Sequence, residues 1–137
     1  MIHFPIEPTK HTPQVRFNKD ENLMEIRGKS YPPDILDFYN PIFAWLTEYL
    51  NRPGQGGFTL NIELVYFNSS SSKILMELFD LLDETAAKGQ RITINWIYDG
   101  EDGDNREFGE EFREDLGSVI FNLIEKEWIN EVEKEPV

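Results

Sequence analysis

The 137-residue sequence contains no cysteine, and its two histidines, His3 and His11, both lie close to the N-terminus. The absence of cysteine excludes thiol catalysis, thiolate metal sites and disulfide bonds within this chain. A serine–histidine pair would require one of these histidines to fold back onto a distant serine. The glycine-rich segment 51–57 lacks the Lys-Ser/Thr pair of a phosphate-binding loop. We therefore predict no catalytic residues and no cofactor, and we interpret both histidines as exposed residues of an N-terminal arm.

Basic residues are also scarce, because 13 Lys and Arg stand against 26 Asp and Glu, which gives a formal net charge of −13. Such a charge repels nucleic-acid phosphates and anionic lipid headgroups, and no basic stripe counteracts it. The sequence lacks a signal-peptide pattern and any apolar run long enough to cross a membrane. We therefore expect a cytoplasmic protein that binds no nucleic acid and does not insert into membranes.

The acidic segment 99–105 must be tested as a metal-binding loop. An EF-hand loop requires oxygen ligands at alternate positions, a central glycine and a glutamate at the twelfth position. Counted from Asp102, the fifth position is Arg106, and counted from Asp99 it is Gly103. Because neither register supplies the ligands, we predict no metal site and interpret the segment as a solvated or partner-facing loop.

The spacing of the apolar residues predicts an α/β fold. Strands are expected at 14–18, 23–28, 58–67 and 91–98, with a strand or short apolar element at 119–124, and helices are expected at 35–50, 70–88 and 106–116. Asp34 is the expected cap of the first helix. Pro41 should kink or split that helix, with Asn40 capping the second part.

Strand–helix–strand connections imply parallel neighbours in a sheet. We therefore predict a single domain over residues 14–124, with a mixed sheet of about four to five strands and helices packed against it. Residues 1–13 form an irregular N-terminal arm in this interpretation. Residues 125–137 form a charged tail in which a turn or two of helix is expected.

Four consecutive serines lie where the longest predicted strand leads into the second helix. The strand ends before Asn68, and the block 69–72 leads into a run with helical spacing. Small polar residues at such a junction serve as N-caps, and the first-turn N–H groups with the helix dipole favour an anion. Two interpretations stay open on the pattern alone. The serines either only cap the helix, which is the commoner role, or one of them carries a phosphoryl group and acts as a switch.

Five segments gain meaning when they are considered together. They are Gly-Lys-Ser-Tyr-Pro-Pro at 28–33, Phe-Tyr-Asn-Pro-Ile at 38–42, Glu-Leu-Val-Tyr-Phe-Asn-Ser-Ser-Ser-Ser-Lys at 63–73, Trp-Ile-Tyr-Asp at 96–99 and Gly-Glu-Glu-Phe-Arg-Glu-Asp at 109–115. In this combination the chain resembles the SiaC family of bacterial regulatory phosphoproteins over about residues 9–124. The Tyr-Phe-Asn-hydroxyl-Ser-x-x-Lys passage is the most specific part of the resemblance.

The resemblance implies a STAS-like fold, similar to the anti-sigma-factor antagonists, and a non-enzymatic switch protein. It implies phosphorylation by a dedicated Ser/Thr kinase and dephosphorylation by a PP2C-type phosphatase. It also implies that the unphosphorylated form binds and activates a diguanylate cyclase or another signalling protein, which links partner switching to cyclic-di-GMP signalling and biofilm formation. The alternative is a STAS-type antagonist that binds an anti-sigma-factor kinase, and neighbouring genes would separate the two.

The resemblance also assigns the site residues. The family's acceptor is commonly a Thr directly after the junction Asn, and in this chain Ser69 occupies that position. We therefore predict a phosphoserine at Ser69, with Ser70 as the second candidate. Asn68 and Lys73 are the predicted neighbours of the phosphate.

Overall fold

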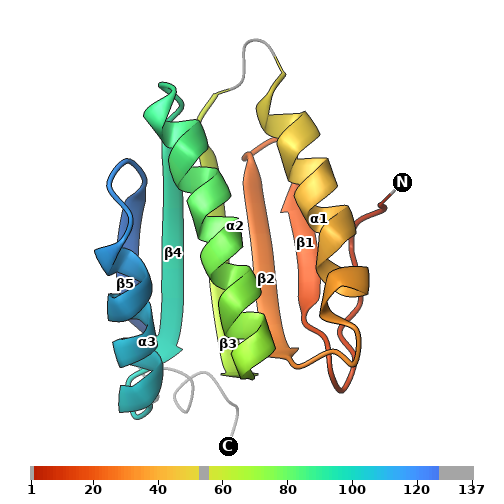
Figure 1. Ribbon diagram of the computed structural model, residues 1–137, viewed down its shortest axis with the longest axis vertical. Helices are drawn as coiled ribbons and strands as arrows, with labels where there is room; N and C mark the ends of the chain where they lie inside the picture. Colours follow the sequence, from red (N-terminus) through yellow and green to blue (C-terminus); the bar gives the residue numbers. More distant parts are fainter. Residues whose placement is uncertain (1, 53–55, 127–137) are drawn as a thin grey trace, which may run out of the picture.

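The computed structural model describes residues 2–52 and 56–126, so the helical turns predicted in the tail 125–137 lie almost entirely outside the described residues. The described part forms one sheet with helices packed on it (Figure 1). Its elements, in chain order, are β1 (Gln14–Asn18), β2 (Leu23–Ser30), α1 (Ile35–Leu50), β3 (Phe58–Phe67), α2 (Ser69–Ala87), β4 (Ile92–Asp99), α3 (Gly103–Glu114) and β5 (Ile120–Lys126). The predicted α/β fold with a mixed sheet is confirmed.

The strands lie in the sheet in the same order as in the chain, β1-β2-β3-β4-β5. β1 and β2 form an antiparallel hairpin, and β2 to β5 are parallel neighbours. Each parallel connection crosses over through one helix, as the alternation of strands and helices requires. The carboxyl ends of β2 and β3 therefore meet at one edge, where Ser30 pairs with Phe67.

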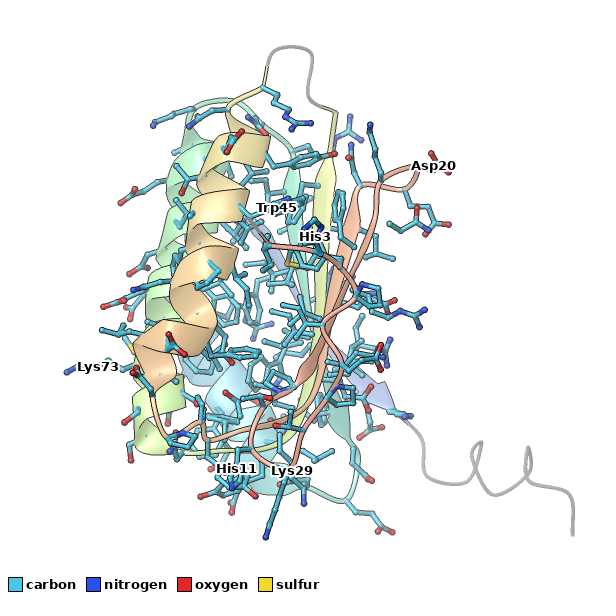
Figure 2. The ribbon with its side chains drawn as sticks, turned by 90° about the vertical axis from the view of Figure 1, so that its right-hand side faces the viewer. His3, His11, Asp20, Lys29, Trp45 and Lys73 are labelled. Carbon is cyan, nitrogen blue, oxygen red and sulfur yellow. The ribbon has the colours of Figure 1, made fainter. Side chains whose placement is uncertain are left out.

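The three helices cover one face of the sheet, and the core lies between the two layers (Figures 1 and 2). The alternating pattern of each strand sends its apolar side chains into this layer. Trp96 on β4 is 1% exposed and is surrounded by rings from β3, α2 and α3. Its indole N–H donates to the carbonyl oxygen of Asn105 at 3.0 Å, so its polar atom is satisfied inside the core.

Among the described residues, no helix lies on the opposite face of the sheet, and side chains on that face bond across the strands. Asn95 donates to Asn61 at 2.8 Å, and Asn122 donates to Asn95 at 3.0 Å, so an amide ladder crosses β3, β4 and β5. Beside it, Arg27 on β2 and Lys126 on β5 both contact the Glu63 carboxylate, at 2.6 and 3.2 Å. These lateral bonds satisfy polar groups on a face that is open to water.

The N-terminal arm is less irregular than predicted. Ile6 forms an antiparallel bridge with Val15, through N–O distances of 2.8 and 3.0 Å, so the arm lies along the outer edge of β1. His3 is exposed as predicted, but His11 is half-buried, with its ring centroid 5.1 Å from that of Tyr31. The interpretation of His11 as an exposed residue was therefore wrong.

Other differences lie at the ends of elements. β2 extends to Ser30 through a register shift after Gly28, whose φ of 126° suits a residue without Cβ. Asp34 caps α1 as predicted, but Pro41 does not split that helix, and Asn40 starts no second one. α3 begins at Gly103, earlier than predicted, because Asp102 accepts the N–H of Asn105 and caps the helix.

Candidate functional site

The predicted site is the junction between β3 and α2, and Asn68 determines its local structure. The side-chain oxygen of Asn68 accepts a hydrogen bond from the Ser71 N–H at 2.9 Å, and the backbone carbonyl oxygen of Asn68 accepts one from the Ser72 N–H at 2.9 Å. Asn68 is therefore the N-cap of α2. The serine block does not supply the cap, and Ser69 is the first residue of the helix, one position earlier than predicted.

The four serines that follow have different surroundings. Ser69 and Ser70 are exposed, Ser71 is completely buried, and Ser72 is half-buried. The helical turn causes this difference, because it directs one of the four side chains into the core. Of the four hydroxyls, those of Ser69 and Ser70 are presented to solvent, and they are the two acceptor candidates predicted from the sequence.

A buried cluster of hydroxyl groups lies directly beneath the junction. Ser71 Oγ donates to the Ser30 carbonyl oxygen at 2.8 Å, and the Ser30 and Ser71 hydroxyls lie 2.7 Å apart. Ser30 Oγ also lies 2.6 Å from Tyr39 Oη. Burial raises the pKa of Tyr39 to about 12, although the hydrogen bond with Ser30 opposes that shift, so the phenol stays neutral. The cluster joins the end of β2, α1 and the first turn of α2.

Sequence reasoning did not assign a role to Ser30, Tyr39 or Ser71. The only signal was indirect, since Ser30 and Tyr39 fall in segments 28–33 and 38–42, which carry the family resemblance. Their hydrogen-bonding roles depend on contacts between residues as far as 41 positions apart.

The solvent side of the junction carries basic and aromatic groups. Lys73 is exposed and lies four residues after Ser69, a spacing that places both side chains on the same helix face. The rings of Tyr31 and Tyr66 lie 5.4 Å apart, and Tyr66 is 52% exposed. Figure 2 shows Lys29 and His11 together at this end of the molecule, with Lys73 projecting from α2. The arrangement can present a modified hydroxyl to a partner, with a positive charge one turn away.

The acidic loop 99–105 has a structural role in the described chain. Asp99 accepts the Glu101 N–H at 2.9 Å, and Asp102 caps α3. Within residues 2–52 and 56–126, no group of three or more His, Asp or Glu residues is placed to hold a metal ion. No helix in that part of the chain is long and apolar enough to cross a membrane.

Comparisons with known proteins agree with this geometry. The model of the SiaC family regulatory phosphoproteins matches residues 6–126. An uncharacterized protein of Pseudomonas aeruginosa (strain UCBPP-PA14) is 32% identical over 114 residues, which are 83% of this chain and 88% of that protein. The crystal structure of the diguanylate cyclase SiaD in complex with its activator SiaC from Pseudomonas aeruginosa contains a chain of similar fold. That chain has a TM-score of 0.84 and 30% identity, over 90% of this chain and all of that one. A separate structure of SiaC from the same species has a TM-score of 0.81 and 29% identity, over 92% of this chain and all of the other.

Proposed function

Because the chain belongs to the SiaC family of regulatory phosphoproteins, we propose that it is a non-enzymatic, phosphorylation-controlled activator of a diguanylate cyclase. The observation that carries the proposal is the position of Ser69. Its exposed hydroxyl opens α2 directly after the cap Asn68, on a fold similar to that of an activator crystallised with its cyclase. Phosphorylation at Ser69 then links the protein to cyclic-di-GMP signalling and biofilm formation.

The unphosphorylated protein is the form that binds the cyclase in this proposal. A Ser/Thr kinase adds phosphate to Ser69, and a PP2C-type phosphatase removes it. Phosphorylation replaces a neutral hydroxyl with a group that carries nearly two negative charges and three acceptor oxygens. The first-turn N–H groups of α2 and the Lys73 ammonium make this dianion tolerable in the free protein.

The same dianion opposes binding at a partner surface. A partner that covers the junction must remove water from the phosphate, and this costs several kcal/mol when the contact does not compensate the charge. The fold does not have to rearrange, because the Ser69 side chain is exposed and the core beneath it is already packed. The switch therefore acts on association and leaves the stability of the free protein nearly unchanged.

The acceptor is tested by incubating the protein with its cognate kinase and ATP and mapping the phosphate by peptide mass spectrometry. We expect the phosphate on Ser69, and no incorporation in Ser69→Ala. Ser72→Ala is the matched control and should be modified as the wild type is. Phosphate on Ser70 alone in the wild-type protein would contradict the assignment of Ser69.

The consequence is tested by titration calorimetry against the cognate cyclase and by its rate of cyclic-di-GMP synthesis. Ser69→Asp should weaken the complex by at least about 2 kcal/mol, or about 30-fold in Kd, and reduce activation. Ser69→Ala should bind and activate as the wild type does. Equal binding by Ser69→Asp and the wild type, at equal melting temperatures, would refute the switch at this residue.

A further inference from the structure

A groove between α2 and α3 is a second feature of the surface that adjoins Ser69. It has a volume of about 770 Å³, with Ser72, Met76 and Phe79 on the α2 side and Phe108, Glu111 and Phe112 on the α3 side. Phe79 and Phe112 are buried in its floor, whereas Met76 and Phe108 are 47% and 43% exposed. Large apolar side chains gathered in one hollow of a soluble protein are typical of a contact surface.

The rim of the groove is strongly acidic. Asp80, Glu111, Glu114 and Asp115 are all exposed, and no Lys, Arg or His is present among its described lining residues. Slight desolvation raises the pKa of the exposed Asp80 carboxyl. The carboxylate of Asp115 across the groove raises it further, as do Asp83, Glu84 and Glu77 on α2 itself. The like charges across the groove therefore repel one another, and a positively charged partner would relieve that repulsion.

The groove opens beside the candidate acceptor. Ser72 lines the groove, and Ser69 lies three residues before it, on the same face of α2. A molecule that fills the groove and extends toward the start of α2 would cover both residues. The groove and the acceptor can thus belong to a single contact surface.

We propose that this groove binds a basic amphipathic helix of the partner, with apolar side chains on Met76 and Phe108 and Lys or Arg side chains on the acidic rim. The proposal rests on the proposed function and names the chemistry of its partner surface. A helix is the occupant because two neighbouring helices leave a channel into which the ridge of a third one packs. The charges favour a basic helix over an acidic or neutral one.

A basic partner remains compatible with inhibition by phosphate. Water and salt weaken the attraction between the exposed phosphate dianion and basic side chains of the partner. The free-energy cost of removing water from the phosphate, beside the apolar residues of the contact, is larger than this attraction. The net effect of phosphorylation is then loss of binding. Raising the salt concentration should also weaken the unmodified complex, because the acidic rim contributes to it.

The test measures binding of the full-length protein to its cognate cyclase by titration calorimetry. Phe108→Ala and Met76→Ala should each raise the Kd at least 10-fold. Val65→Ala, a 61% exposed apolar residue on the open face of the sheet, is the matched control and should change the Kd less than 2-fold. Two separate apolar variants are needed because the Phe108 ring also packs 5.1 Å from Phe67, so that its loss can affect folding.

The contribution of the acidic rim to binding is tested by a second set of variants. Asp80→Asn combined with Asp115→Asn should raise the Kd at least 5-fold and reduce its dependence on salt. Asp37→Asn combined with Glu48→Gln removes the same amount of charge from α1, and this control should leave the Kd and its dependence on salt unchanged. Groove variants that bind as tightly as the wild type, or control variants that lose as much, would overturn the proposal.

A synthetic probe separates this inference from the proposed function. A fluorescein-labelled 20-residue helix of Leu and Lys, amphipathic by its spacing, should bind the wild type and lose at least 5-fold in affinity for Phe108→Ala. The same peptide with Glu in place of Lys should not bind. If the cyclase does not bind the wild-type protein, the proposed function fails, and this peptide alone decides whether the groove takes a basic helix. Equal affinity of the Lys peptide for the wild type, Phe108→Ala and Met76→Ala refutes the groove.

Discussion

Replacing Ser71 by alanine tests whether the buried serine stabilises the fold more than the other serines of the block do. The substitution removes the bond from Ser71 Oγ to the Ser30 carbonyl oxygen and the contact between the Ser30 and Ser71 hydroxyls. The groups left behind keep other partners, since the Ser30 carbonyl oxygen still accepts the Asn68 N–H at 3.2 Å and Ser30 Oγ still contacts Tyr39. Each lost hydrogen bond is worth about 1 kcal/mol net, so the free energy of unfolding should fall by about 1–2 kcal/mol.

This loss can be converted into a melting temperature. An unfolding entropy of about 2.1 cal/mol/K per residue predicts a decrease of about 4–7 °C for a chain of this length. Thermal unfolding and urea titration should both detect it. Ser72→Ala and Ser70→Ala are the controls, and each should change the stability by no more than about 0.5 kcal/mol.

The phosphorylation assay completes the test of Ser71. At saturating kinase, Ser71→Ala should still accept phosphate at Ser69, because the acceptor hydroxyl itself is unchanged. A stability of Ser71→Ala equal to that of Ser72→Ala would show that the buried hydroxyls do not hold the junction. Phosphate on Ser71 in the wild-type protein would show that this turn opens, and would refute the reasoning from burial.

Two further changes test how the surrounding elements are held. Gly109→Ala places a Cβ 2.5 Å from Trp96 Cδ1, so overpacking of about 1–3 kcal/mol should exceed the gain of about 1 kcal/mol in helix propensity and lower the melting temperature. Gly103→Ala, with no atom within 4 Å of the new Cβ, is its control, and a stabilised Gly109→Ala would contradict the packing. For Asp83, burial raises the pKa, but bonds from the N–H groups of residues 117–119 outweigh it and hold the pKa below its ordinary value. Asp83→Asn should cost no more than about 1 kcal/mol near pH 7, because partial solvent exposure weakens the effect of the charge. The difference should be complete above the ordinary pKa of about 4 and shrink as the pH falls through the lower pKa of the folded state. Urea midpoints between pH 3 and 7 measure it, and a constant difference would contradict the assignment.

Most elements of this fold follow from the sequence because their signals are local. The alternation in 58–67 and 91–98 predicted β3 and β4 to within one residue at either end, and the order of strands and helices predicted the parallel neighbours within the mixed sheet. Of the two outcomes predicted for Pro41, the split does not occur, because one proline removes few hydrogen bonds and packing of α1 on the sheet outweighs its cost. A kink at Pro41 stays a prediction.

The site was only partly predictable, because some of its residues carry local sequence signals and others meet only through packing. The junction pattern and the family resemblance located Asn68, Ser69 and Lys73. The assignment of Ser69 as the phosphate acceptor stays a prediction. The burial of Ser71 could not be predicted, because a block of identical residues carries no periodicity. Its partners Ser30 and Tyr39 come from other elements and meet it only when β2, α1 and α2 pack together.

The face of the sheet that the described helices leave uncovered gives the molecule a side for attachment. The amide ladder from Asn61 to Asn122 lies on this face, whereas α2, which begins at Ser69, packs on the other one. Since the native chain has no thiol, one cysteine introduced at Ile124, which is 40% exposed on β5, would be its single coupling point. A chip or fluorophore linked there would leave α2, α3 and Ser69 facing outward, so every immobilised molecule would present the same side to a kinase or a cyclase.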